Sequence, residues 1–325
     1  MGKISHAYII NGEEGSGKMN LAIHFAKALQ CERNNSNKAI NEDGERITVP
    51  GTACGQCKSC KQTDSKNQPD IKYITYEKSG IGVDEIREQI NDDIDIKPYS
   101  SPYKIYIVPE SEKMTVQAQN ALLKTIEEPP EYAIIILLTT NADTFLQTIL
   151  SRCVMLNIRP VKEDIIKNQL TSQYGVGDYE ARVAATFSNG NPGKAIKLAT
   201  SEEFKELKQY VVGMFMSLEK GGMDIIGEAI KKTGTFKKQI DEYFSLMRIW
   251  FRDILVYKAT KEEDQIIFQD EYMTIEKMSQ TYSFDDINDI LKAIDLAESR
   301  IKSNVNFDST IEILLLSIKE KTSGK

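Results

Sequence analysis

A glycine-rich loop near the start of the chain limits the possible fold more than any other feature. Gly12, Gly17 and Lys18 form the pattern G-x-x-x-x-G-K, with Gly15 inside it, which is typical of loops whose backbone N–H groups hold phosphate. The apolar run 7–10 before the loop predicts a strand, and residues 21–29 after it predict a helix. A strand, a phosphate loop and a helix in this order indicate an α/β domain built on a parallel sheet.

The chain changes character near Pro160. All nine prolines lie at or before Pro192, and two further strand candidates, 104–108 and 134–138, precede Pro160. From residue 202 to residue 321 the apolar residues recur at helical spacing, with no proline to interrupt them. We therefore expect an α/β core over 1–160, a small helical lid over 161–201 and an all-helical domain over 202–325.

Four of the five cysteines form a second pattern. Cys54, Cys57 and Cys60 are spaced so that three thiolates can bind one ion, and Cys31, at the end of a predicted helix, can complete a tetrahedral Cys₄ site. Four protein ligands leave no position for water, so we expect a structural Zn²⁺. Disulfides are the alternative, but the first residues do not resemble a signal peptide, and five cysteines are few for a secreted scaffold of this length. The polar segment 32–53 predicts a loop.

The phosphate loop lacks the residues that hold magnesium in an active ATPase. Met19 follows Lys18 where a Ser or Thr hydroxyl is needed, and a thioether cannot replace that hydroxyl. After the strand 104–108, where an Asp would bind the metal, the sequence has Pro109 followed by Glu110. We expect no intrinsic ATPase activity; weak binding of ATP through Gly12, Gly15, Gly17 and Lys18 stays open, as does a loop kept only as a scaffold.

Composition argues against two classes of function. No apolar run approaches the roughly 20 residues of a membrane span, so we expect no membrane partner and a cytoplasmic location. The net charge of −7 provides no overall attraction to nucleic acid, so any work near DNA is expected to go through partners. His6 and His24 show no partner pattern for a nucleophilic triad.

Several motifs together resemble the delta-prime family of bacterial clamp-loader subunits, which belongs to the AAA+ class. The resemblance extends over nearly the whole chain. It is carried by Ser5-His6-Ala7-Tyr8, by Pro69-Asp70 after the cysteines, by the string from Ala118 to Pro130, by Leu137-Leu138-Thr139-Thr140-Asn141 and by Ser151-Arg152-Cys153.

The resemblance implies a subunit that supports the motor subunits of the clamp loader without hydrolysing ATP itself. The core would be an AAA+ P-loop domain with a zinc module at about 31–60, and 202–325 would join a helical collar with the motor (gamma/tau) subunits and the delta subunit. The complex would load the sliding clamp on primer-template DNA for the DNA polymerase III holoenzyme. Arg152 would act as an arginine finger, reaching in trans into the ATP site of a neighbouring motor subunit.

Other interpretations stay open on the residues alone. Arg152 follows a predicted short helix, 144–150, where a cation is favourable without any catalytic role. The chain could be a motor subunit that hydrolyses ATP, which Met19 and Pro109 oppose. It could also be a zinc-containing DNA-binding regulator of the AAA+ class, which the acidic net charge opposes. Trp250, in an apolar helical stripe, is expected in a core or a subunit contact.

Overall fold

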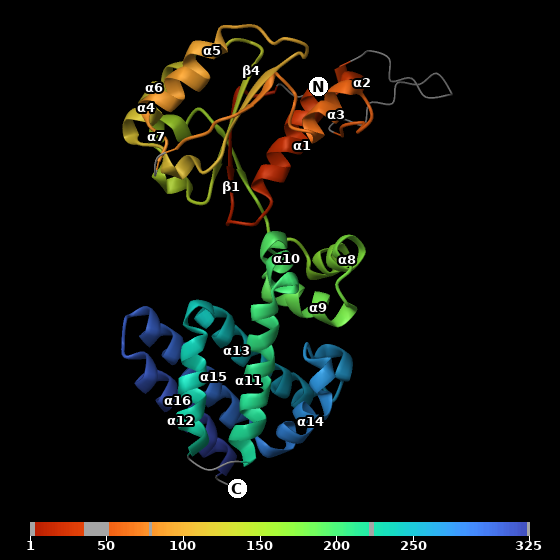
Figure 1. Cartoon of the computed structure of the whole chain (residues 1–325), viewed down its shortest axis with the longest axis vertical. Coiled ribbons are helices and arrows are strands. Elements are labelled where there is room, and N and C mark those ends of the chain that lie inside the picture. The colour runs from red at the N-terminus through yellow and green to blue at the C-terminus, as the bar shows by residue number, and fades with distance from the viewer. Residues whose placement is uncertain (1–3, 36–51, 78–79, 221–223, 324–325) are drawn as a thin grey trace, which may run out of the picture. The chain divides into compact units, whose positions relative to one another are not determined.

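The computed structural model describes residues 4–35, 52–77, 80–220 and 224–323, and its chain forms two compact units (Figure 1). The first unit comprises 1–160 with 191–193, and the second comprises 161–190 with 194–325. The first is α/β and the second is helical, which confirms the predicted fold class. The predicted lid falls mostly with the C-terminal helices in this division, and its status as a separate domain remains a prediction.

The first unit alternates strands and helices. Its strands are β1 (Ala7–Asn11), β2 (Ile71–Tyr73), β3 (Lys104–Val108), β4 (Ala133–Thr139) and β5 (Val154–Asn157). Its helices are α1 (Lys18–Gln30), α2 (Glu32–Asn35), α3 (Lys58–Asp64), α4 (Val83–Ile86), α5 (Asp92–Ile94), α6 (Val116–Glu127) and α7 (Gln147–Leu150), with a π-helical segment, Arg87–Asn91, between α4 and α5. The insertion predicted as a loop therefore begins with the short helix α2, and residues 36–51 lie outside the described part.

The five strands form one parallel sheet in the order β2-β3-β4-β1-β5. All seven residues of β4 are buried, because helices cover both faces of the sheet. Along β4, Ile134 and Ile136 belong to the cluster that contains α1, whereas Ile135 and Leu137 belong to the cluster that contains α6. Figure 1 shows α1 on one side of the sheet and α6 on the other. Parallel packing brings the carboxyl ends of β1, β3 and β4 to one edge, where ligands bind in folds of this kind.

The second unit is built from helices around one apolar core. They are α8 (Glu163–Tyr174), α9 (Asp178–Phe187), α10 (Pro192–Thr200), α11 (Glu202–Lys220), α12 (Asp224–Thr235), α13 (Ile240–Thr260), α14 (Tyr272–Thr281), α15 (Phe284–Lys302) and α16 (Phe307–Ser323). The first two residues of α10 belong to the first unit. The expected core position of Trp250 is confirmed, because its indole is buried in α13 and stacks on Phe215 with ring centroids 5.7 Å apart. None of the described helices combines the length and apolar character needed to cross a membrane.

A partly buried ion cluster connects α5 to the sheet. Lys104, at the start of β3, is buried, and its ammonium donates to the carboxylate of Asp93 and to the backbone carbonyls of Asp93 and Ile96 at 2.7–3.0 Å. Lys72 and the hydroxyl of Tyr106 also bind the Asp93 carboxylate. Burial alone would raise the pKa of Asp93, but the hydrogen bonds from Lys104, Lys72 and Tyr106 outweigh it and hold the pKa below the ordinary value. The ionised carboxylate therefore stabilises the folded first unit.

We expect Asp93→Asn to lower the free energy of unfolding of the first unit by about 1–3 kcal/mol at pH 7, because Lys104 stays buried without its counter-charge. The folded-state pKa of Asp93 is depressed, so its contribution is present above the unfolded pKa of about 3.9 and is lost as the pH falls through the folded value. The stabilities of wild type and variant should therefore begin to converge below about pH 4. Denaturant unfolding between pH 3 and pH 7 measures this difference.

Asp95→Asn is the matched control, because Asp95 is exposed and lies two residues from Asp93. It removes the same charge from the same segment and should change stability by less than about 0.5 kcal/mol. Equal losses in the two variants, or a loss in Asp93→Asn that does not depend on pH, would contradict the role given to the cluster.

Candidate functional site

The phosphate loop has the backbone shape that its glycines predict. Gly15 has φ 80° and Gly17 has φ 92°, a left-handed conformation that residues with a side chain rarely adopt. Gly17 is the N-cap of α1, so Lys18 is the first residue of the helix. The loop thus connects the carboxyl end of β1 to a helix N-terminus, in the arrangement that binds phosphate in other proteins.

Lys18 folds back onto the loop. Its ammonium donates to the carbonyl oxygens of Gly12 and Glu13 at 2.5 and 2.8 Å. Burial lowers the pKa of Lys18. Two of its three donors are therefore committed to the protein's own backbone rather than directed outward.

Residues 191–193 pack directly on the same loop. The side-chain amide of Asn191 donates to the carbonyl of Glu14 at 2.7 Å, and the backbone N–H of Gly193 donates to the carbonyl of Gly15 at 2.9 Å. A Cβ atom on Gly193 would lie only 2.7 Å from the Cα of Gly15, so glycine is needed for this approach. With the two bonds from Lys18, each carbonyl from 12 to 15 accepts a hydrogen bond from within the protein.

Met19 and Glu110, at and next to the positions expected to bind magnesium, make other contacts. Met19 packs against the apolar cluster that contains α1. Glu110, which follows Pro109, has φ 47° and binds the ammonium of Lys113 at 2.8 Å and the hydroxyl of Tyr76. These bonds hold the pKa of Glu110 below its ordinary value. The carboxylate is thus paired with its own neighbours.

Asn141 stabilises the turn after β4. Its side-chain oxygen accepts the backbone N–H of Asp143 at 3.0 Å and caps the 3₁₀ turn Ala142–Thr144. The hydroxyls of Thr139 and Thr144 donate to its backbone carbonyl. These contacts give Asn141 a structural role in this turn.

The four cysteines of the predicted metal site come together. The Sγ atoms of Cys31, Cys54, Cys57 and Cys60 all lie within 4.8 Å of one another, and those of Cys54 and Cys60 are 3.9 Å apart. Tetrahedral zinc with Zn–S distances of about 2.3 Å needs sulfurs about 3.8 Å apart, so the cluster fits a metal ion of this kind. Cys31 and Cys60 are fully buried, whereas Cys54 and Cys57 are half-buried.

Backbone N–H groups surround the cysteine sulfurs. The N–H groups of Cys54, Cys57 and Cys60 donate to the sulfurs of Cys31, Cys54 and Cys57, each at 3.4 Å. Donors from Gln56 and Cys57 lower the pKa of Cys54 to about 6, whereas burial raises the pKa of Cys60. A cation is therefore needed if all four sulfurs are to be thiolates.

The cysteine cluster is attached to the sheet unit by polar contacts. Lys27 of α1 forms an ion pair with Asp64 at the end of α3, at 2.6 Å. Asp70, just beyond α3, is buried and accepts three backbone N–H groups, from Tyr99, Ser100 and Ser101. The Pro69-Asp70 motif thus fixes a loop before β3.

The described contacts of Arg152 involve neither the phosphate loop nor the cysteine cluster. Arg152 follows α7. The single helix expected over 144–150 is not present: the structure has a 3₁₀ turn, Ala142–Thr144, and the short α7, because Phe145 and Leu146 between them are extended. The side chain of Arg152 is 40% exposed. Cys153 beside it is half-buried, and burial raises the pKa of its thiol to about 12.

The guanidinium of Arg152 is nevertheless held at several points. It pairs with the carboxylate of Glu127 at 2.9 Å and donates to the carbonyl of Thr148 and the hydroxyl of Ser151 at 3.1 and 3.2 Å. Glu127 lies within the motif from Ala118 to Pro130, and the motif by itself assigns it no individual role. The sequence carries no local signal for this pair, because the partners are far apart along the chain.

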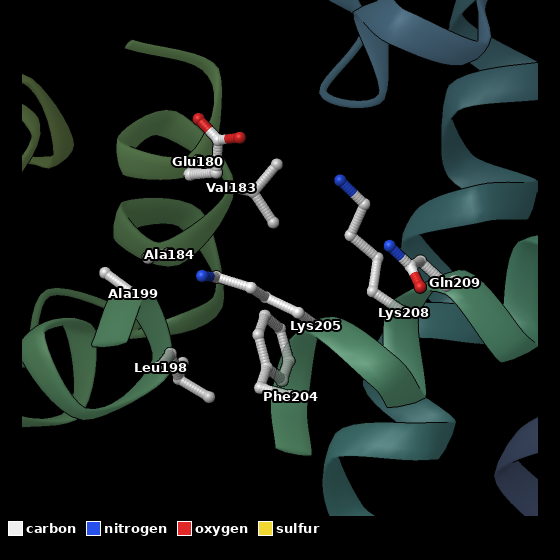
Figure 2. A pocket seen from close by; sticks show the side chains of 9 residues that line it. All are labelled: Glu180, Val183, Ala184, Leu198, Ala199, Phe204, Lys205, Lys208 and Gln209. Carbon is white, nitrogen blue, oxygen red and sulfur yellow. The ribbon is translucent and has the colours of Figure 1, made fainter. Parts of the chain in front are cut away.

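A pocket of about 120 Å³ lies in the second unit, between α9, α10 and α11 (Figure 2). Its apolar wall includes Val183, Leu198 and Phe204, and Lys205 extends across it in the close view. Lys208 at its edge donates to the hydroxyl of Tyr179 at 2.9 Å, and burial lowers its pKa. The pocket contains none of the residues that the sequence singled out.

Two family models match the chain. The model described as DNA polymerase III, delta subunit, matches residues 1–162, and the model described as its C-terminal part matches residues 227–320. Among curated proteins, the chain is 27% identical over 322 residues to DNA polymerase III subunit delta' of Bacillus subtilis, covering 98% of this chain and 92% of that protein. It is also 33% identical over 201 residues to the tau subunit of the same organism, of which it covers 33%.

Solved structures give matches of lower similarity. A gamma subunit-related protein of DNA polymerase III from Thermotoga maritima has a TM-score of 0.38 at 20% identity, with 99% of this chain and 96% of that chain covered. The delta protein of the Bacillus subtilis DNA clamp loader has a TM-score of 0.28 at 14% identity, with 98% and 96% covered. The match to the delta' subunit over nearly the full length of both chains, together with the two family models, shows that this chain belongs to the delta-prime family of DNA polymerase III clamp-loader subunits.

Proposed function

We propose that this chain is a non-motor subunit of the clamp loader, which supports ATP hydrolysis in a neighbour and performs none itself. The observation that carries the proposal is the state of its own phosphate loop. Met19 packs in an apolar cluster, Pro109 has no ligand to offer, and Glu110 is paired with Lys113. A Mg²⁺–ATP complex would find no protein ligand at the two usual positions. The loop carbonyls accept hydrogen bonds from within the protein, and Lys18 folds back onto two of them, which supports a structural role for the loop rather than nucleotide binding.

We further propose that Arg152 is an arginine finger for the ATP site of an adjacent motor subunit. Its guanidinium is exposed, permanently charged and planar, which suits two-point contact with a transferring phosphoryl group. Such a group, supplied in trans, neutralises charge that develops in the transition state. The position of Arg152 on a turn outside its own phosphate loop supports action on another subunit.

The partners follow from the family. The tau and gamma subunits among the relatives are candidates for the motor subunits beside this chain, with the delta subunit as another neighbour. The helices of the second unit are the proposed collar contact. The sliding clamp and primer-template DNA would be reached through the whole complex, in the cytoplasm.

We propose that Cys31, Cys54, Cys57 and Cys60 bind one structural Zn²⁺. The sulfur separations fit tetrahedral coordination, and four protein ligands leave no open position for catalysis. The ion would supply the positive charge that lets four closely spaced thiolates coexist. It would also join Cys31, at the end of α1, to α3, which begins after Cys57.

We expect the purified chain to contain one zinc ion, and Cys57→Ser to reduce that content sharply. The variant should also lower the Tm of the first unit by roughly 6–12 °C, since losing a structural metal ligand costs about 3 kcal/mol in a domain of this size. Elemental analysis and thermal unfolding measure the two effects.

Cys153→Ser is the matched control, because Cys153 is the one cysteine outside the cluster. It should keep the full zinc content. A metal-free chain with undiminished Tm, or equal metal loss in both variants, would rule out the structural site.

The proposed finger is tested in a clamp loader reconstituted from this chain, the motor subunits and the delta subunit. We expect Arg152→Ala to lower the DNA- and clamp-stimulated rate of ATP hydrolysis at the neighbouring site by roughly tenfold or more, with assembly unchanged. Arg152→Lys should restore little of the rate, because lysine keeps the charge but lacks the planar fork.

Arg159→Ala serves as the control, because Arg159 is another exposed arginine of the same segment. It should leave the rate unchanged. An unaltered rate in Arg152→Ala would refute the arginine finger, and ATP hydrolysis with magnesium by this chain alone would refute the non-motor function.

A further inference from the structure

The ion pair between Glu127 and Arg152 joins two motifs that the sequence presents separately. Glu127 is the last residue of α6, and Arg152 follows α7. The Nη2 atom of Arg152 lies 2.9 Å from Oε1 of Glu127. We propose that Glu127 is a positioning residue, which sets the direction of the Arg152 guanidinium for a phosphoryl group of the adjacent subunit. This inference rests on the proposed function of Arg152.

The two residues of the ion pair lie at the ends of α6 and α7, which contact each other. Gln119 of α6 donates to the carbonyl of Thr144 at 3.1 Å and accepts the N–H of Leu146 at 2.8 Å, so α6 holds the chain just before α7. Ile149 of α7 is fully buried in the cluster that contains α6. A side chain supported by two rigid elements keeps its geometry better than one on a free loop.

The end of α6 also fixes where Glu127 stands. Its successor Glu128 still donates its N–H to the carbonyl of Lys124, and Pro129 and Pro130 then prevent the helix from continuing. The carboxylate of Glu127 is therefore placed at the helix terminus by local sequence. Its side chain is 45% exposed, so it can meet a surface arginine without a large desolvation cost.

The ion pair with Glu127 leaves N–H donors of Arg152 for binding phosphate. A guanidinium has five N–H donors. The hydrogen bonds to Thr148 and Ser151 engage two of them, both on Nη1, and the ion pair with Glu127 lies at Nη2, so among the described contacts at least two donors remain for a phosphate oxygen pair. The arginine can thus be anchored on one side and bind on another.

The ion pair is strong enough to orient the Arg152 side chain but too weak to keep it from binding a phosphate. An ion pair between groups exposed to this degree changes an equilibrium by about fivefold at most, whereas the finger itself is worth on the order of 10³-fold in related phosphoryl-transfer switches. Glu127 cannot hold the arginine away from a phosphate. It can favour one orientation of a side chain that would otherwise sample several.

Four variants of this chain in the reconstituted clamp loader test the proposal: Glu127→Gln, Arg152→Ala, the two together, and Glu128→Gln. We expect Glu127→Gln to lower the maximal ATPase rate two- to fivefold with KM for ATP unchanged, and Glu128→Gln, an adjacent exposed carboxylate, to have no effect. In the Arg152→Ala background, Glu127→Gln should cause no further loss, because its effect passes through the arginine. The Tm of each variant should equal that of wild type.

The outcomes separate the two proposals. If Arg152→Ala leaves the rate unchanged, the finger itself is refuted, and the positioning role with it. If Arg152→Ala lowers the rate while Glu127→Gln matches wild type or exceeds it, the finger stands and the positioning role is refuted. An equal loss from Glu127→Gln with and without Arg152 would also refute positioning, since Glu127 would then act independently.

Discussion

Burial of the parallel sheet on both faces is the constraint on which the rest of the first unit depends. β4 is buried along its whole length, and its alternate residues face two separate clusters of helices. This covering aligns the carboxyl ends of β1, β3 and β4 at one edge. The phosphate loop, Glu110 and the turn after β4 all lie at these strand ends because of that alignment. The candidate site is thus a consequence of the sheet, and local sequence decides only which side chains occupy it.

The sequence predicted the elements whose signal is local. β1, β3 and β4 are apolar runs, and the spacing of Cys54, Cys57 and Cys60 is sufficient to predict that these cysteines come together in a cluster that could hold a metal ion. β2 and β5 were missed for two physical reasons. β2 has three residues, which is too short for a periodicity, and β5 is an edge strand with mostly exposed residues, so it lacks the apolar run of a buried strand.

Interactions between distant segments could not be predicted from periodicity. Lys104 stands at the start of an apolar strand, and only the fold brings Asp93 to it. The contact of Gly193 with Gly15 and the pairing of Glu127 with Arg152 likewise join residues that are far apart in the sequence. Each depends on how elements pack, and the residues involved carry no pattern that differs from an ordinary solvated charge or a turn glycine.

The phosphate loop shows why a nucleotide-binding motif can remain without its ligand. The carbonyl groups of a loop of this shape can accept hydrogen bonds from the protein as well as from water. Here Lys18, Asn191 and Gly193 supply the donors, so the lysine and glycines of the motif have a structural use of their own. Met19 packs against the apolar cluster that contains α1, and neither Met19 nor Pro109 is among the described donors to the loop carbonyls. The residues that shape the loop and those that bind magnesium can therefore change independently, and the pattern G-x-x-x-x-G-K alone does not establish an ATPase.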